Sequence, residues 1–290
     1  MKHIFMVNRF TLRKHVDEMV ARIEKAAKEL KLDYKIEVND EKHSTEDILK
    51  KYQKGENIIF AVGGDGILNR TLNCIVGTKN KLGCIPAGTG NDFNRSINDD
   101  CKEGDNLIDL IKYNKRYFIN VACFGLDADV ANDDKIVHNK FIPKSQQYNV
   151  GVVKHLITFK PYTFTVKYDK KEVTEKVAAI TVCNGHYYGG GYKVNPKGKY
   201  DDGIMDAYLI KATNRRMVIK YIFALLKGKQ GDLDLVEHIK TKKFTLISEK
   251  EFCGNFDGED LTSKKFEMEV VPKGITVYYN KKLVDLINQK

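Results

Sequence analysis

An apolar run that ends in a glycine-rich turn constrains this chain more than any other feature. Residues 58–62 (IIFAV) have the length and composition of a buried strand. The turn that follows precedes residues able to begin a helix and consists of Gly63, Gly64, Asp65 and Gly66. Such a junction presents free backbone N–H groups at a helix N-terminus, where the dipole favours an anion. The segment predicts a phosphate-binding turn, and an ordinary strand-to-helix turn is the alternative.

A second glycine turn follows about twenty residues later. Residues 82–85 form a short candidate strand that leads into Pro86, Ala87, Gly88, Thr89, Gly90, Asn91, Asp92 and Phe93. Two such turns at the carboxyl ends of parallel strands can converge on one crevice. Asp65 and Asp92 would then form an acidic pair beside bound phosphates, and such a pair requires a cation between it and a nucleotide.

Composition limits the other options. A chain of 290 residues that is 42% hydrophobic can build one large domain or two of ordinary size without disulfide bonds or metal ions to stabilise the core. Its six cysteines lie singly and its seven histidines show no metal-binding spacing, so they are interpreted as core or surface residues. No segment reaches the roughly 20 apolar residues of a membrane span, and the N-terminal apolar run is too short for a signal peptide. A cytoplasmic protein is expected.

The order of the predicted elements indicates two domains. Strands and helices alternate up to residue 121, with a helical apolar stripe over residues 16–30, which predicts an α/β nucleotide-binding domain with a parallel sheet. After it come short β segments and one helix, Arg215–Leu226, which predict a β-sandwich-like domain over residues 122–279. The tail, 280–290, is expected to pack back on domain 1–121, and the active site to lie between the domains. The polar segment 132–147 is expected to be a mobile loop.

The two turns resemble the nucleotide-binding signature of the diacylglycerol kinase catalytic domain, a family that includes bacterial soluble lipid kinases and sphingosine kinases. The match continues in the same order over nearly the whole chain, through residues 116–121, 184–185, 189–191, 201–203, Asp206 and 257–259. The resemblance implies an ATP- and Mg²⁺-dependent kinase. Residues that would bind the nucleotide are Asn8, Gly63, Gly64, Asp65, Gly66, Gly88, Thr89, Gly90 and Asn91.

The same resemblance implies the metal and catalytic residues. Asp65, Asp92 and Asp109 would position Mg²⁺ on the ATP phosphates, although Asp109 could equally be a helix-surface charge. Asp257 would be the base that takes the hydroxyl proton, with Glu259 as its partner; from the residues alone, Asp257 and Gly258 read as a hairpin turn.

A structural Mg²⁺ site is a further implication of the resemblance. Lys199 and Asp202 resemble the positions that hold such an ion in some bacterial members. The alternative is a plain turn at residues 201–203.

Some positions depart from the family pattern. Ile67 replaces a common threonine, Arg70 stands where an acidic residue is common, and the N-terminal turn survives only as residues 8–12. The altered N-terminal turn bears on the adenine-side contacts, and together the changes could retune the choice of nucleotide or lipid or mark a weakened enzyme.

The function predicted is phosphorylation of a membrane lipid, with diacylglycerol as the first choice. Phosphatidylglycerol, a sphingoid base or NAD are alternative acceptors, and a weakened lipid- or nucleotide-binding protein is another reading. The net charge of +10 suits peripheral docking on an anionic membrane surface. Lysine-rich faces that could contribute are Lys167, Lys170, Lys171, Lys242, Lys243, Lys264 and Lys265. No nucleic-acid-binding motif is seen, so nucleic acid is not an expected partner, and a homodimer is compatible with the sequence.

Overall fold

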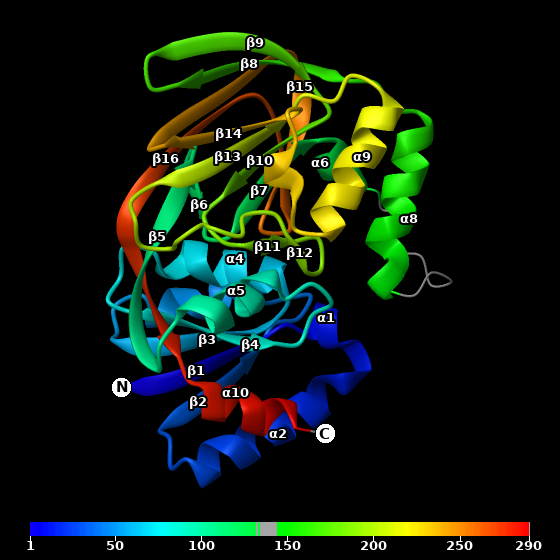
Figure 1. Ribbon diagram of the computed structural model, residues 1–290. Coiled ribbons are helices and arrows are strands. Elements are labelled where there is room, and N and C mark those ends of the chain that lie inside the picture. The colour runs from blue at the N-terminus through cyan, green and yellow to red at the C-terminus, as the bar shows by residue number, and fades with distance from the viewer. Residues whose placement is uncertain (132, 134–143, 290) are drawn as a thin grey trace. The chain divides into compact units, whose positions relative to one another are not determined.

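The computed structural model describes residues 1–131, 133 and 144–289, and its chain forms two compact units. Unit 1 contains residues 1–109 together with the C-terminal segment from residue 272, and unit 2 contains residues 110–271. The chain leaves unit 1 within strand β5 (Gly104–Tyr113) and returns within β16 (Glu259–Tyr279). Unit 1 is therefore built from both ends of the sequence, coloured blue to cyan and red in Figure 1.

Unit 1 contains a parallel sheet in the order β2, β1, β3, β4. Its central strands read as apolar runs because both faces of a parallel sheet are covered. Strand β1 lies between β2 and β3, so the connections diverge at its carboxyl end, which is where ligands bind in sheets of this type. The strands span Lys2–Val7 (β1), Tyr34–Val38 (β2), Asn57–Gly63 (β3) and Lys81–Pro86 (β4).

Amphipathic helices of unit 1 pack their apolar faces against this sheet. The predicted apolar stripe forms α2 (Val16–Glu29), whose buried residues recur at three- and four-residue intervals. The C-terminal helix α10 (Lys281–Asn288) packs beside α2 and buries Leu283 and Ile287 in the same core. The other helices of this unit are α1 (Arg9–Leu12), α3 (Thr45–Leu49), α4 (Asp65–Ile75) and α5 (Asp92–Asp100), with 3₁₀ turns at Arg13–His15 and Lys50–Tyr52.

Unit 2 is built on antiparallel strands in the order β14, β13, β10, β7, β15, β16. Strand β15 also pairs with the hairpin of β8 and β9, and β5 pairs with β6 and β16. The strands span Arg116–Phe118 (β6), Val121–Gly125 (β7), Tyr162–Tyr168 (β8), Lys171–Val177 (β9), Ala179–Cys183 (β10), Tyr187–Tyr188 (β11), Tyr192–Lys193 (β12), Met205–Ile210 (β13), Val236–Thr241 (β14) and Lys243–Phe256 (β15).

An irregularity in β15 gives unit 2 its sandwich-like form. The register between β15 and β16 shifts between Ile247 and Phe252, so the first part of β15 pairs with β8 and its last part pairs with β7. A strand that changes partners at a bulge can belong to two layers. Inward-facing aromatic and aliphatic side chains of these layers form one core.

Three helices of unit 2 cover one side of its sheet, as Figure 1 shows: α6 (Leu126–Ala131), α8 (Lys144–Ile157) and α9 (Arg215–Leu226). A second core lies beneath α9, and a 3₁₀ turn (Gln230–Asp232) follows that helix.

The predicted fold class, an α/β domain followed by a β-sandwich-like domain, is confirmed. The helix predicted at Arg215–Leu226 has those bounds. The loop predicted over residues 132–147 is wrong for residues 144–147, which begin α8, because polar residues such as lysine and glutamine have good helix propensity. Residues 132 and 134–143 of that loop lie outside the described residues. An active site between the two domains stays a prediction.

Candidate active site

The two glycine turns of unit 1 fold against each other. Strand β3 ends at Gly63, and α4 begins two residues later with Gly64, which has no side chain to form a cap, as its N-cap residue. The backbone N–H groups of Ala87 and Gly88, in the second turn, both donate to the carbonyl oxygen of Gly63, at 2.8 and 3.1 Å. The N-terminus of α4 therefore lies beside a second glycine-rich turn, and such a pairing is typical of phosphate-binding sites.

Only glycine permits this approach. A Cβ atom on Gly88 would lie 2.4 Å from the Cα of Gly64, and a Cβ on Gly90 would lie 2.8 Å from Oδ2 of Asp65. Any larger residue would push the turns apart. The predicted convergence of the two turns is thus observed within unit 1.

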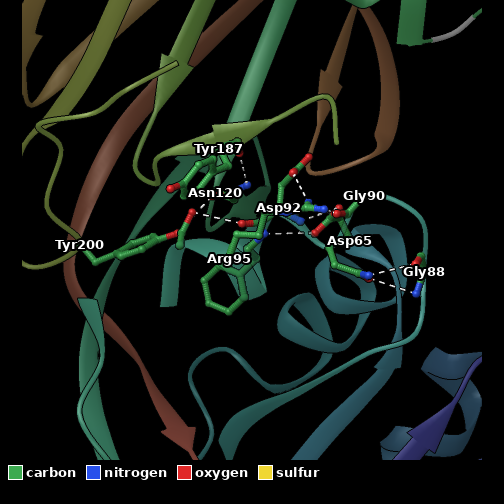
Figure 2. Close-up of polar contacts among 11 residues, drawn as sticks. Asp65, Gly88, Gly90, Asp92, Arg95, Asn120, Tyr187 and Tyr200 are labelled. Atoms are coloured by element: carbon green, nitrogen blue, oxygen red, sulfur yellow. Dashed lines mark hydrogen bonds and ion pairs between the residues drawn. The ribbon is translucent and has the colours of Figure 1, made fainter. Parts of the chain in front are cut away.

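Asp65 connects these turns through its side chain. Its carboxylate oxygens accept the backbone N–H groups of Asp92 and Phe93, each at 3.3 Å, and so cap α5 (Figure 2). Asn91, with a left-handed φ of 54°, closes its own turn: its Oδ1 accepts from the N–H of Gly88 at 3.0 Å, and its Nδ2 donates to the Gly88 carbonyl at 2.9 Å. The amide of Gly88, predicted to contact phosphate, is therefore already bonded twice.

Arg95 is a residue that the sequence reasoning missed. Its Nη1 lies 2.8 Å from Oδ1 of the buried Asp92 and also donates to the carbonyl oxygen of Gly90 (Figure 2). These contacts hold the second turn in place. The Arg95 side chain, which carries five N–H donors, is 40% exposed, so part of it stays accessible to solvent. The available signal was a basic residue three positions after the first-turn aspartate of a helix.

Of the three aspartates predicted to position Mg²⁺, Asp109 has a structural hydrogen bond of its own. Asp109 is buried on β5 and its Oδ1 accepts the N–H of Lys273 at 2.7 Å, a bond that ties β16 to β5 within unit 1. Among the described residues, no three His, Cys, Asp or Glu side chains are grouped to hold a metal ion. Mg²⁺ on a nucleotide usually takes one or two protein carboxylates and completes its shell with phosphate oxygens and water. Asp65 and Asp92 fit that requirement, and a metal role for Asp109 stays a prediction.

Asn8 lies at the carboxyl end of β1. Its Oδ1 accepts the N–H of Phe10 at 3.2 Å and its Nδ2 donates to Thr11 Oγ1 at 2.9 Å, so the side chain caps α1. A Cβ built on Gly63 would lie 3.4 Å from the Cβ of Asn8. Asn8 therefore lies beside the first glycine turn, and its contact with nucleotide stays a prediction.

Asp257 lies in the hairpin turn between β15 and β16, in unit 2. Both turn residues are left-handed, with φ of 49° at Asp257 and 85° at Gly258, as a two-residue hairpin of type I′ requires. The hairpin interpretation was therefore correct about the backbone. The side chain, however, points inward and is 5% exposed.

Three backbone amides hold the Asp257 carboxylate. The N–H groups of Ile119, Asn120 and Val121 donate to it at 2.7, 3.0 and 2.9 Å. These bonds fix the position of the carboxylate and satisfy three buried backbone donors. Asp257 is thus a brace for the start of β7, and its role as base, with Glu259 two residues later at the start of β16, stays a prediction.

Asn120 extends this braced region. Its Oδ1 accepts the hydroxyl of Tyr200 at 3.1 Å, and its Nδ2 donates to the carbonyl of Tyr187 at 2.9 Å (Figure 2). A Cβ on Gly185 would lie 1.9 Å from Asn120 Oδ1, so glycine is required there. The sequence reasoning gave Asn120 no role, and its signal was a buried amide inside an apolar run.

The proposed structural metal residues lie in a turn. Lys199 and Asp202 are exposed, and Oδ1 of Asp202 accepts the N–H of Ile204 at 3.1 Å, just before β13. The segment therefore forms the turn that was predicted as the alternative. Metal binding there stays a prediction.

A polar pair inside unit 2 was also missed. Oδ1 of Asp206 lies 2.6 Å from Nε2 of His238, and Asn195 donates to its Oδ2 at 3.1 Å. Burial alone would raise the pKa of Asp206, but these hydrogen bonds and the nearby Lys240 outweigh it, so the pKa lies below its ordinary value.

Unit 2 also contains an apolar cavity of about 230 Å³. It lies among α6, α8, α9 and the ends of β10 and β13, and Asp127 and three tyrosines are the polar residues of its wall. Its lining consists of Leu126, Asp127, Val152, Val153, Leu156, Ala178, Ala179, Tyr188, Tyr192, Ile210, Val218, Ile219, Tyr221, Ile222, Phe223 and Leu225.

Comparison with known proteins agrees with the two units. Residues 2–121 match the diacylglycerol kinase catalytic domain, and residues 120–279 match the YegS C-terminal NAD kinase beta sandwich-like domain. A probable lipid kinase, YegS-like, from Shewanella frigidimarina is 29% identical over 228 residues, 73% of each chain. The diacylglycerol kinase of Bacillus subtilis is 25% identical over 261 residues, 85% of this chain and 84% of that one.

Solved structures show the same fold. A Bacillus anthracis str. Sterne structure superposes with a TM-score of 0.80 at 23% identity, covering 97% of this chain and 96% of the other. A second, of a diacylglycerol kinase from the same organism, gives 0.67 at 19% identity, covering 97% and 98%. In this chain a diacylglycerol kinase catalytic domain precedes a YegS C-terminal domain. The chain therefore belongs to the diacylglycerol kinase family and is a kinase with an alcohol acceptor.

Proposed function

We propose that this protein transfers the γ-phosphate of ATP, with Mg²⁺, to the free hydroxyl of diacylglycerol and so produces phosphatidic acid. The apolar cavity of unit 2 is the observation that supports a lipid as the acceptor. An engineered cavity of about 150 Å³ with an apolar lining already accepts benzene, so one of 230 Å³ has room for a segment of an acyl chain.

On the nucleotide side, the N-terminus of α4 and the turn of residues 87–91 would hold the phosphates. Asp65 and Asp92 would hold Mg²⁺, which when bound neutralises charge on the phosphate oxygens. Arg95 keeps the second turn in place through Gly90 and Asp92. Phosphoryl transfer depends mainly on such positioning.

On the acceptor side, Asp257 would take the proton of the lipid hydroxyl as phosphate is transferred to that oxygen. The three amides that hold its carboxylate fix its position before substrate binds. Asn120 keeps the same segment in place through Tyr200 and Tyr187.

The test is transfer of labelled phosphate from Mg-ATP to diacylglycerols of increasing chain length in mixed micelles, beside phosphatidylglycerol, a sphingoid base and NAD. Ile222→Trp, which narrows the cavity, should lower kcat/KM for long-chain diacylglycerol at least about tenfold and affect a short-chain one less than about twofold. Leu107→Trp, on an exposed residue of β5, is the matched control.

Preferential transfer to another acceptor would reject diacylglycerol as the substrate. Equal loss on short and long chains in Ile222→Trp would reject the cavity as the acyl site. Nucleotide binding without transfer to any acceptor would favour a binding protein.

A further inference from the structure

Exposed apolar side chains concentrate on two helices of unit 2. Six of the nine large apolar residues that are exposed in the described part of the chain lie on α8 and α9. We call these six the apolar crest: Val150, Val153 and Ile157 of α8, and Ile219, Phe223 and Leu226 of α9, with exposures from 39% to 63%. On each helix they recur at three- or four-residue intervals, so each set forms one stripe.

Helix α9 is apolar on two faces. Val218, Tyr221 and Leu225 form its buried stripe, and the crest residues form a second stripe that faces outward. A helix that exposes such a stripe usually has something to cover it. Helix α8 packs beside α9, as Figure 1 shows, and continues the exposed surface.

The cavity opens at the crest. Val153, Ile219 and Phe223 line the cavity, yet they are 61%, 40% and 60% exposed. Their side chains thus form its mouth. An apolar molecule that lies against the crest would therefore contact side chains that also line the cavity.

The charges around α9 identify the partner. Residues 214–231 contain Arg215, Arg216, Lys220, Lys227 and Lys229 and no acidic residue, and all five side chains are exposed. Helical spacing places Arg216, Lys220 and Lys227 along the crest on the side away from the buried stripe. None of the five forms an ion pair within the described residues. By contrast, Lys167, Lys243 and Lys265 of the lysine-rich faces each pair with a glutamate.

We infer that the apolar crest and the basic residues of α9 dock on an anionic bilayer, and that lipid enters the cavity directly from it. This inference rests on the proposed lipid substrate. Apolar side chains enter the interfacial layer while lysine and arginine contact the head groups, and each basic residue contributes about fivefold to binding. None of the described helices has the length and apolarity to cross a bilayer, so attachment would be at the surface. A symmetric dimer through this face would bring two sets of five positive charges together, which opposes a second copy as the occupant.

The experiment measures sedimentation of the full chain with vesicles of phosphatidylcholine that contain phosphatidylglycerol. The double variant Ile157→Ser/Leu226→Ser changes crest residues outside the cavity lining. It should weaken vesicle binding at least about tenfold while transfer to monomeric short-chain diacylglycerol stays unchanged. Phe10→Ser/Leu107→Ser, two residues of similar exposure in unit 1, is the matched control and should bind like the wild type.

Charge reversal provides the second arm. Arg216→Glu/Lys220→Glu should lower binding to these vesicles at least about tenfold, and pure phosphatidylcholine should bind the wild type equally weakly. Equal binding of the crest and control variants would overturn the inference. So would a dimer in sedimentation velocity that Ile157→Ser/Leu226→Ser dissociates. Vesicle binding needs no turnover, so a protein that binds as described but phosphorylates no lipid would reject the proposed function and leave the docking surface standing.

Discussion

Asp65 in unit 1 and Asp257 in unit 2 both use their carboxylates to accept backbone N–H groups. The two regions differ in the length and burial of these hydrogen bonds. Each accepts backbone N–H groups of a distant segment. Asp65 is half-buried and accepts two amides at 3.3 Å, whereas Asp257 is buried and accepts three at 2.7–3.0 Å. Shorter and more buried bonds to a charge are stronger.

The two aspartates therefore differ in how much the stability of the fold depends on them. The two bonds that Asp65 accepts are long, so we expect their loss to cost the fold little. Asp257 cannot be changed without leaving three buried amides unpaired. Loss of activity in an Asp257 variant is therefore informative only beside a measurement of folding.

The largest effect is expected for Asp257→Ala. Removal of the brace should lower the free energy of unfolding by about 3–5 kcal/mol, because the buried donors lose a charged acceptor, and phosphate transfer should fall at least about a thousandfold. Urea unfolding beside a transfer assay measures both. Asp260→Ala, on an exposed residue of the same hairpin, is the control, and a cost below about 1 kcal/mol for Asp257→Ala would contradict the brace.

Asp65→Asn should separate activity from stability. Transfer should fall about a hundredfold, since a charge beside the phosphates is lost, while the unfolding free energy changes by only about 1 kcal/mol, the cost of weakening a cap. Asp17→Asn, in the first turn of α2, serves as control. If Asp65→Asn costs as much stability as Asp257→Ala, the contrast between the two units is wrong.

Gly88→Ala tests the backbone contact that Asp65 spans. Its Cβ would lie 2.4 Å from Gly64 Cα, so the turns must separate, and we expect a loss of about 2 kcal/mol and about tenfold weaker ATP binding by calorimetry. Gly231→Ala has no atom within 4 Å of the added Cβ and should behave like the wild type. Unaltered ATP binding in Gly88→Ala would show that the close approach is not needed.

Asp206 extends the comparison to a buried aspartate held by side chains. Because its pKa is lowered in the folded protein, its contribution to stability is full above its ordinary pKa of 3.8 and is lost as pH falls through the folded value. Asp206→Asn should therefore cost about 1 kcal/mol near neutral pH and less in acid. Urea unfolding across that range checks this, and a difference that grows toward low pH would refute it.

Much of the fold followed from local patterns. The apolar run before Gly63 indicated a parallel strand because both faces of such a strand are covered, and the spacing in residues 16–30 and 215–226 indicated helices. The family motifs located the turns and Asp257. The polar residues at 144–147 misled, because polarity alone does not distinguish a loop from the first turn of a helix.

The α/β and β-sandwich-like parts, the glycine turns and the kinase family could be predicted without the structure, since they depend on periodicity and on residues close together in the chain. Three features could not: Asp257 binds amides 136–138 residues away, Arg95 holds Asp92, and α8 and α9 border a cavity beneath an exposed crest. Hydrogen bonds and cavities arise from groups that packing brings together, and local patterning does not encode which distant groups will meet.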